Sequence, residues 1–121
     1  MKKLSSLLLA ALLTLLALPP SATAAAKEPA IGDTAPDFSF TDFDGKKHHL
    51  SEFRGKPVLL DVWATWCGPC IQEIPTLRAL HEELDKNFII LSISIDDKPG
   101  TAQAYVAKNN MPWTQGFCPG A

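Results

Sequence analysis

The feature that most constrains this chain is an apolar run, Val58 to Trp63, that leads through a short turn to Cys67 and Cys70. Both sides of this run are apolar except at Asp61, which predicts a strand covered on both faces in the middle of an α/β sheet. A helical pattern follows at once, with Pro69 in its first turn, where the missing N–H costs nothing. The sequence therefore predicts strand, turn and helix in succession, with Cys67 at the start of the helix.

The two cysteines stand at C-x-x-C spacing, where a helix offers free N–H groups and the positive end of its dipole. Both effects stabilise a thiolate, which is the nucleophilic form of cysteine. We expect Cys67 to attack a partner's disulfide and Cys70 to resolve the mixed disulfide. A structural disulfide and half of a zinc site are alternatives. Zinc needs two more ligands, and neither Cys118 nor the histidines stand at ligand spacing.

The first 24 residues have the pattern of a secretory signal peptide. Lys2 and Lys3 precede an apolar run from Leu4 to Leu18, and small residues ending at Ala24 follow. The apolar run, about 15 residues, is shorter than the ~20 that a membrane-spanning helix needs. We predict cleavage after Ala24 and export to an oxidising compartment, with a retained N-terminal membrane anchor as the alternative.

One domain is expected after the leader, with residues 25–30 as a linker and 31–121 as the domain. The chain's net charge is −2, and removal of the leader, which carries two lysines, would make it more negative. This charge argues against nucleic acid or an anionic membrane surface as a partner.

Short elements are expected before the Val58–Trp63 strand. Phe38 and Phe40 alternate with polar residues, residues 42–45 supply a turn, and residues 46–50 can return as a second strand, which predicts a hairpin. Ser51 is predicted to cap a single helical turn ending at Gly55.

A βαβ unit is expected around the cysteines. A helix over about residues 69–85 and a strand over 88–95 follow, and such units are right-handed with parallel strands. Ile89, Leu91, Ile93 and Ile95 share one face of that strand. A second helix over 101–109 and an extended segment over 111–117 complete the expected elements.

Two sets of residues carry a family resemblance. Trp66-Cys67-Gly68-Pro69-Cys70 is similar to the active-site motif of thioredoxins, and Pro75 matches the proline that bends their active-site helix. The flanking residues resemble the TlpA/ResA-type thioredoxin-like proteins of bacterial periplasms, in three segments: Ile31–Phe38, Asp44–Lys46 and Leu50–Val58. The resemblance covers residues 31–113 and implies a thioredoxin-like α/β fold with an N-terminal hairpin and a βαβ unit.

The resemblance places two acids beside the cysteines. Asp61 matches the buried aspartate of thioredoxins, and a lone carboxyl group on an apolar strand is independently expected to have a raised pKa. Such a group can accept and return the proton of Cys70. Glu73 stands at the Cys-x-x-Glu offset of the TlpA/ResA-type proteins, and both acids would titrate together with the dithiol. A solvated Asp61, and a Glu73 that Pro75 turns into water, are the alternatives.

A substrate-binding surface is also implied. Trp66 resembles the exposed tryptophan that precedes the thioredoxin motif and meets a partner, and Gly68 and Pro69 adjoin it. Trp63 is expected in the core.

The resemblance implies an exported thiol:disulfide oxidoreductase that reduces protein disulfides. It implies no cofactor beyond the Cys67–Cys70 pair. The clients of relatives include apocytochrome c before haem attachment, and a membrane-bound thiol reductase would supply electrons. An AhpC/TSA-type peroxidase is the alternative enzyme, although its Pro-x-x-x-Thr-x-x-Cys pattern is not matched, because Thr65 lies only two residues before Cys67.

The C-terminal end departs from the family pattern. Thioredoxin-like domains continue with a cis-proline segment, two strands and a closing helix, and neither Pro112 nor Pro119 sits in that motif. We therefore expect an incomplete domain in which one side of the Val58–Trp63 strand is unpaired. An inactive truncated fragment is the third functional alternative.

Other chemistry-bearing residues are expected outside the site. Cys118 is the odd cysteine and is expected to be free. His81 falls on the apolar helix face and is interpreted as structural. His48 and His49 are adjacent in a predicted strand, so they face opposite ways and do not share a metal.

Overall fold

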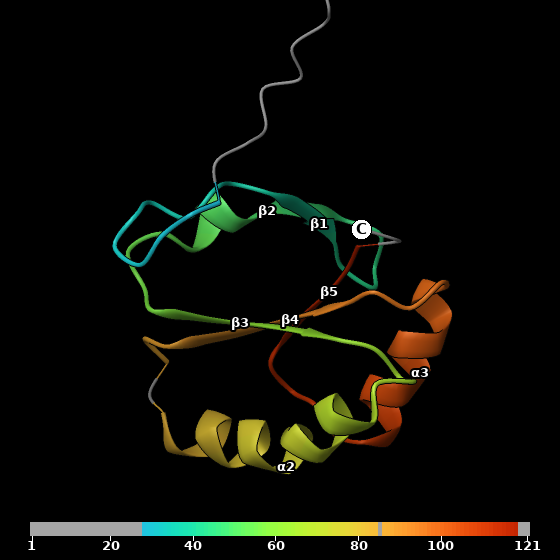
Figure 1. Cartoon of the computed structure of the whole chain (residues 1–121). Helices are drawn as coiled ribbons and strands as arrows, with labels where there is room; N and C mark the ends of the chain where they lie inside the picture. The colour runs from blue at the N-terminus through green and yellow to red at the C-terminus, as the bar shows by residue number, and fades with distance from the viewer. Residues whose placement is uncertain (1–27, 85, 119–121) are drawn as a thin grey trace, which may run out of the picture. The chain divides into compact units, whose positions relative to one another are not determined.

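The computed structural model describes residues 28–84 and 86–118 (Figure 1). The chain divides into two units, residues 1–34 and 35–121. In the described part of the first unit, the Asp33 carboxylate accepts a hydrogen bond from the Ala30 N–H at 2.9 Å. The predicted signal peptide, residues 1–24, and residues 25–27 of the predicted linker lie outside the described residues. Among the residues described, none of the helices has the length and hydrophobicity that crossing a membrane requires.

The second unit is built on one mixed sheet of five strands in the order β2-β1-β5-β4-β3. The strands are β1 (Ser39–Thr41), β2 (Lys47–His49), β3 (Val58–Trp63), β4 (Ile89–Ser94) and β5 (Thr114–Phe117). The described residues of this unit also form two α-helices, α2 (Gly68–Glu83) and α3 (Pro99–Lys108), and the 3₁₀ helix η1 (Leu50–Phe53). The predicted elements are therefore present, and the α/β class is confirmed.

The predicted hairpin is formed by β1 and β2, which pair antiparallel with Phe40 opposite His48. The turn between them closes through the Asp42 side chain, which accepts hydrogen bonds from the N–H groups of Asp44 and Lys46. Gly45 has a φ of +83°, which glycine adopts without strain.

The helical turn after β2 is capped differently from the prediction. The Glu52 side chain accepts a hydrogen bond from the His49 N–H at 2.9 Å, so His49 holds the N-cap position of η1. The hydroxyl of Ser51, the predicted cap, donates to the carboxylate of Asp37, 14 residues away, at 2.9 Å instead of capping the helical turn. A sequence pattern does not indicate such long-range partners.

Two crossovers place both helices on one face of the sheet. Strands β3, β4 and β5 are parallel neighbours, and α2 and α3 connect them in turn (Figure 1). Because both connections move in the same direction across the sheet, the two helices cover the same face. Arg78 on α2 ties them together by donating to the carbonyl groups of Asn109 and Asn110 just after α3.

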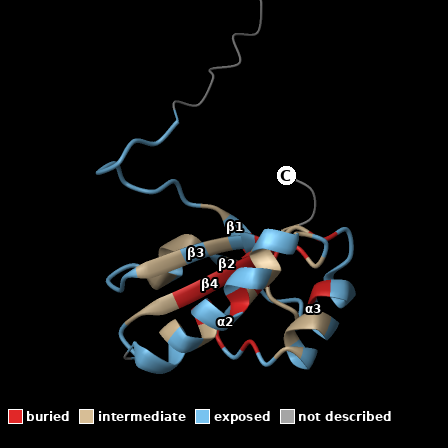
Figure 2. Cartoon of the chain, turned by 60° about the horizontal axis from the view of Figure 1, so that its bottom comes forward, coloured by how far each residue is buried: buried red, intermediate tan, exposed pale blue. Residues whose placement is uncertain are grey.

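The most buried strand is β4 rather than β3. Five of the six residues of β4 are buried, while β3 lies at the sheet edge (Figure 2). Leu60 and Val62 on β3 remain 45% and 53% exposed. The prediction that β3 is covered on both faces is therefore wrong, whereas its expected unpaired side is confirmed. An apolar pattern on both sides of a strand does not show whether another element covers each face.

The hydrophobic core has one cluster on each face of the sheet. On the helix face, Trp63, Ile74, Leu77, Ile90, Ala102, Met111 and Trp113 are buried together. On the other face, Phe40 packs with Leu91 and Ile93. Gly116 on β5 lies against this second cluster, where an added Cβ would overlap the side chains of Phe40 and Ile93. The fold therefore fixes β3 and the start of α2 against a packed helix-side core.

Candidate active site

The turn between β3 and α2 places Cys67 at the helix start. The Cys67 N–H donates to the Ala64 carbonyl at 3.0 Å, and the Cys67 carbonyl accepts the first helical hydrogen bond, from Ile71, at 3.0 Å. Cys67 is the N-cap residue of α2, and proline occupies the first turn, as predicted. Free N–H groups and the helix dipole therefore lie beside its sulfur, an arrangement that stabilises a thiolate in the reduced protein.

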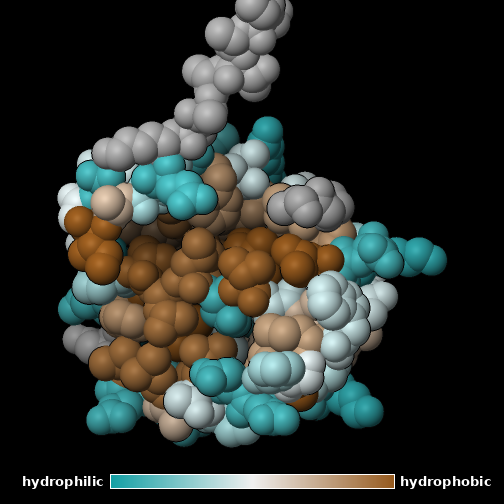
Figure 3. All heavy atoms as spheres, in the orientation of Figure 1, coloured by the Kyte–Doolittle hydropathy of each residue, from teal (hydrophilic) through white to brown (hydrophobic). Residues whose placement is uncertain are grey.

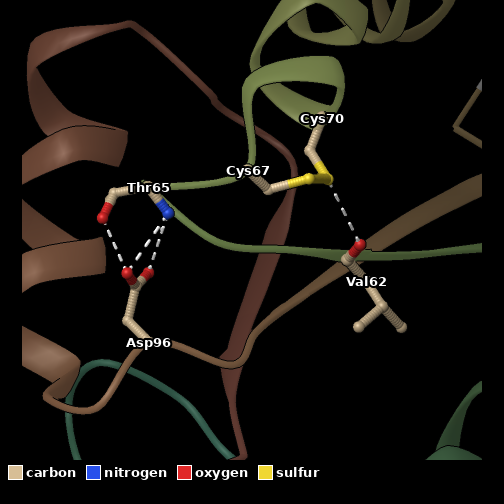
Figure 4. Close-up of a disulfide and its surroundings, with 5 residues drawn as sticks. All are labelled: Val62, Thr65, Cys67, Cys70 and Asp96. Atoms are coloured by element: carbon tan, nitrogen blue, oxygen red, sulfur yellow. Dashed lines mark hydrogen bonds between the residues drawn. A yellow bond between two sulfur atoms is a disulfide. The ribbon is translucent and has the colours of Figure 1, made fainter.

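Cys67 and Cys70 form a disulfide, with their Cα atoms 5.3 Å apart (Figure 4). Both residues are partly buried. The Cys70 sulfur lies 4.0 Å from the Val62 carbonyl oxygen on β3. In the reduced protein, a Cys70 thiol at this position can donate a weak hydrogen bond to that oxygen.

A buried carboxylate anchors the turn that carries Cys67. Asp96, which is 2% exposed just after β4, accepts hydrogen bonds from the Thr65 N–H at 3.2 Å and the Thr65 hydroxyl at 2.6 Å (Figure 4). Ser94 donates a further hydrogen bond to Asp96 at 2.7 Å. Because Thr65 is two residues before Cys67, these contacts tie the cysteine turn to the end of β4.

Asp61 lies on the helix-covered face of β3. Its Oδ2 accepts a hydrogen bond from the Ser92 hydroxyl at 2.8 Å, and Ser92 in turn accepts one from Trp113 Nε1 at 2.8 Å. Partial burial raises the pKa of the Asp61 carboxyl group above its ordinary value, the Ser92 hydrogen bond lowers it, and the charge of Glu73 raises it further. The raised pKa agrees with the expectation for a carboxyl group on an apolar strand.

Glu73 and Trp66 lie on the surface near the cysteines in sequence. Glu73 on α2 is exposed, and its charge reaches Asp61 strongly enough to raise the pKa of that carboxyl group. The buried residues of α2 are Ile74 and Leu77, and Glu73 is not among them. Trp66 is 70% exposed and Trp63 is 2% exposed, as predicted for each. Gly68 and Pro69 are exposed beside Trp66.

The remaining candidates lie elsewhere. Cys118 is a free, partly buried cysteine after β5. His81 is exposed rather than buried on the apolar face, and its ring packs 6.0 Å from the Trp113 ring, between centroids. His48 contacts Asp42 and Glu52, whereas His49 lies 3.9 Å from Asp37, so the two histidines have separate partners. Within residues 28–84 and 86–118, no three His, Cys, Asp or Glu side chains gather as metal ligands.

Three residues at the site escaped sequence reasoning: Asp96, Ser92 and Trp113. Ser92 lies within the apolar run of β4 and Asp96 lies two residues after its end, and polar residues in or beside such a run are a signal that could have drawn attention to them. Trp113 offered no such signal, because its contact with Ser92 spans 21 residues.

Comparison with known proteins places the chain in a family. The AhpC/TSA family matches residues 31–117. The chain belongs to the AhpC/TSA family. Within this family, it is similar to the thiol-disulfide oxidoreductase ResA of Geobacillus thermodenitrificans, with 41% identity over 69 residues, 56% of this chain and 40% of the relative. The ResA protein of Bacillus thuringiensis is 35% identical over 82 residues, 67% of this chain and 47% of the relative.

Solved structures confirm the thioredoxin-like fold of this AhpC/TSA family member. The thioredoxin domain of a Bacteroides vulgatus thiol-disulfide oxidoreductase is 30% identical with a TM-score of 0.66, covering 74% of this chain and 64% of that one. A thiol-disulfide oxidoreductase from Bacteroides fragilis is 32% identical with a TM-score of 0.64, covering 70% and 65%. The chain thus spans less than half the length of the two ResA relatives and about two thirds of these structures.

Proposed function

We propose that this chain carries the redox site of a thiol-disulfide oxidoreductase that reduces disulfides in other proteins. The observation that carries the proposal is the Cys67–Cys70 disulfide at the N-cap of α2. The names of the relatives, thiol-disulfide oxidoreductases, support the same reaction class.

The reaction is a pair of thiol–disulfide exchanges. In the reduced protein the Cys67 thiolate attacks one sulfur of a client disulfide, forms a mixed disulfide and releases the other client sulfur as a thiolate. Cys70 loses its proton and attacks Cys67, which re-forms the Cys67–Cys70 disulfide and releases the second client thiolate. Two electrons pass to the client, whose sulfurs take up two protons.

Asp61 is the proposed proton acceptor for Cys70. Its raised pKa brings its proton affinity closer to that of a thiol, which favours proton exchange between the two groups. Glu73 is proposed to adjust this titration through its charge. Exposed Trp66, Gly68 and Pro69 are proposed as the surface that meets the client.

The cellular setting is proposed from the sequence. The signal-peptide pattern of residues 1–24 supports export to the periplasm. Because export leads to an oxidising compartment, the cycle needs an electron donor, for which we propose a membrane-bound thiol reductase. Apocytochrome c before haem attachment is the proposed specific client, on the resemblance to TlpA/ResA-type proteins.

The test uses the full chain in reduction of insulin disulfides by dithiothreitol. Cys67→Ser should abolish the catalysed rate, and Cys70→Ser should accumulate mixed disulfides with the client because the resolving thiol is gone. Cys118→Ser is the matched control and should leave the rate unchanged. If Cys70→Ser traps no client and both thiols alkylate at equal rates, the nucleophile assignment is wrong. Peroxide consumption that depends on Cys67, without insulin reduction, would favour the peroxidase alternative.

A further inference from the structure

Three side chains from separate segments form a hydrogen-bonded row beneath α2. Trp113, before β5, donates its indole N–H to the hydroxyl of Ser92 on β4, and Ser92 donates to Oδ2 of Asp61 on β3, each at 2.8 Å. Ser92 is 0% exposed and Trp113 is 5% exposed, so the hydrogen bond between them is shielded from water, whereas Asp61 is partly buried. The row therefore connects the core of the unit to the carboxyl group that the proposed reaction uses.

While Asp61 is ionised, the chemistry of the groups fixes the direction of each hydrogen bond. An indole N–H can only donate, and a serine hydroxyl has a single proton. Because Ser92 accepts from Trp113, its proton is free for Asp61, whose ionised carboxylate can only accept. The row is thus fully satisfied when Asp61 is ionised. When Asp61 is protonated, its carboxyl oxygen is a weaker acceptor for the Ser92 proton than a carboxylate oxygen, so the hydrogen bond favours the ionised form.

We propose that Trp113 and Ser92 are positioning residues that hold the Asp61 carboxyl group in place and favour its ionised form through a directed hydrogen bond. The inference deepens the proposed function, because it rests on Asp61 being the proton acceptor of Cys70. Ser92 offsets part of the burial that disfavours the charge on Asp61. This balance keeps the carboxyl group able both to accept a proton and to release it.

Among the described residues, titratable groups from both helices adjoin the row: Glu73 and His81 on α2, and Tyr105 on α3, which packs against the core cluster that contains Trp113. The negative charge of Glu73 raises the pKa of Asp61. His81 packs against the Trp113 ring at 6.0 Å between centroids. Cys67 and Cys70 do not titrate while they are joined as a disulfide. A measurement on the oxidised chain therefore isolates Asp61 from the thiols.

The test is a carbon-13 NMR titration of the Asp61 carboxyl carbon in the oxidised full chain, with its signal assigned by its loss in Asp61→Asn. Ser92→Ala should lower the acid dissociation constant of Asp61 by roughly three- to tenfold, because the lost hydrogen bond stabilises the charged carboxylate more than the neutral acid. Trp113→Phe should also lower the acid dissociation constant of Asp61, but by a smaller factor. Without the indole N–H, the Ser92 hydroxyl can rotate and direct its proton away from Asp61. Ser92→Thr keeps a hydroxyl and should restore the wild-type titration.

Ser94→Ala is the matched control. Ser94 is also a 0% exposed serine on β4, but its hydroxyl donates to Asp96 rather than to Asp61. This variant should leave the Asp61 titration unchanged. If Ser92→Ala also leaves it unchanged, or if Ser94→Ala shifts it equally, the inference is wrong. If Ser92→Ala does not fold, the Trp113→Phe variant decides: an Asp61 titration equal to that of the wild-type chain would overturn the inference.

The titration and the insulin assay fail independently. A shifted Asp61 titration with no insulin reduction by the wild-type chain would support the row and overturn the proposed function. Insulin reduction by the wild-type chain, together with an unchanged Asp61 titration in Ser92→Ala, would support the proposed function and overturn the role of the row. In the reduced chain, the pH profile of Cys70 alkylation should shift with the Asp61 titration, which a merely structural serine would not cause.

Discussion

At the scale of single residues, the turn that carries Cys67 depends on one carboxylate far away in the sequence, that of Asp96. Asp96 holds Thr65 across 31 residues, through both the backbone N–H and the hydroxyl of Thr65. Hydrogen bonds to a charged acceptor are stronger than neutral ones, and this acceptor is 2% exposed. The position of Cys67 relative to the sheet is therefore set by Asp96 as well as by the start of α2.

Replacement of Asp96 should loosen this turn. Asp96→Ala is expected to lower the free energy of unfolding by about 2–3 kcal/mol, because Thr65 and Ser94 lose a charged partner. Urea unfolding of the oxidised full chain measures the change. The exposed neighbour provides the control, since Asp97→Ala should change the free energy of unfolding by less than about 0.5 kcal/mol. Equal effects of the two substitutions would contradict the anchoring role of Asp96.

At the scale of elements, His48 joins the β1–β2 hairpin to η1. Its Nε2 lies 2.9 Å from Oδ2 of Asp42 in the hairpin turn, and its Nδ1 lies 3.0 Å from Oε2 of Glu52 in η1. The His48 ring also stacks on Phe40 at 5.4 Å between centroids. Contact with Glu52 and then with Asp42 raises the pKa of His48 above its ordinary value of 6.5. His48 in turn lowers the pKa of both carboxyl groups.

The stability of the hairpin is therefore expected to depend on pH. A raised histidine pKa contributes stability below 6.5, and that contribution is lost as the pH rises through the raised value. The lowered carboxyl pKa values act in the opposite sense and lose their contribution in acid. The midpoint of thermal unfolding should fall as the pH rises above 6.5 and through the raised pKa of His48, and His48→Gln should flatten that fall.

The neighbouring histidine tests whether the effect is specific. His49 is exposed and lies 3.9 Å from a single carboxylate, that of Asp37. His49→Gln should keep the pH dependence that His48→Gln removes. A wild-type chain in which the His48 ring titrates at the ordinary value, as measured by proton NMR, would show that the two carboxylates do not hold the imidazolium form.

At the scale of the whole second unit, the two faces of the sheet are covered unequally. Helices α2 and α3 cover one face (Figure 1). Leu60 and Val62 on β3 are exposed. They adjoin a hollow of about 290 Å³ lined by Phe38, Ser39, Leu60, Val62, Ile93, Ile95 and Cys118. Figure 3 shows hydrophobic side chains gathered in the area where β3 lies in Figure 1. An apolar area of this kind attracts apolar ligands and other chains.

Polar substitutions on this face should reduce its affinity for apolar dyes. The double variant Leu60→Ser, Val62→Thr is expected to bind less anilinonaphthalene sulfonate, as measured by dye fluorescence, because it removes exposed apolar side chains from the hollow. Its free energy of unfolding should change by less than about 1 kcal/mol, since both positions are solvent-exposed. Leu84→Ser alters an exposed leucine after α2 and should leave dye binding unchanged. Equal dye binding by the double variant and the wild type would show that this face does not bind the dye.

Much of the fold could be predicted because its determinants are local. The apolar run of β3, Pro69 in the next turn and the C-x-x-C spacing each act over a few residues, and the structure has β3, α2 and the Cys67–Cys70 disulfide at these positions. The hairpin was predictable for the same reason, because Asp42 closes its turn within four residues. The assignments of catalytic roles to Asp61 and Glu73 stay predictions until their titrations are measured.

By itself, the sequence determined the order of strands and helices and the placement of Cys67 at a helix N-terminus, because backbone propensity and side-chain periodicity are encoded residue by residue. Only the tertiary structure decided that β3 lies at the sheet edge, that Asp96 anchors Thr65, and that Trp113 and Ser92 reach Asp61. These contacts join residues at least 21 positions apart. Their existence depends on strand order and on the packing of both helices against one face, which no local pattern specifies.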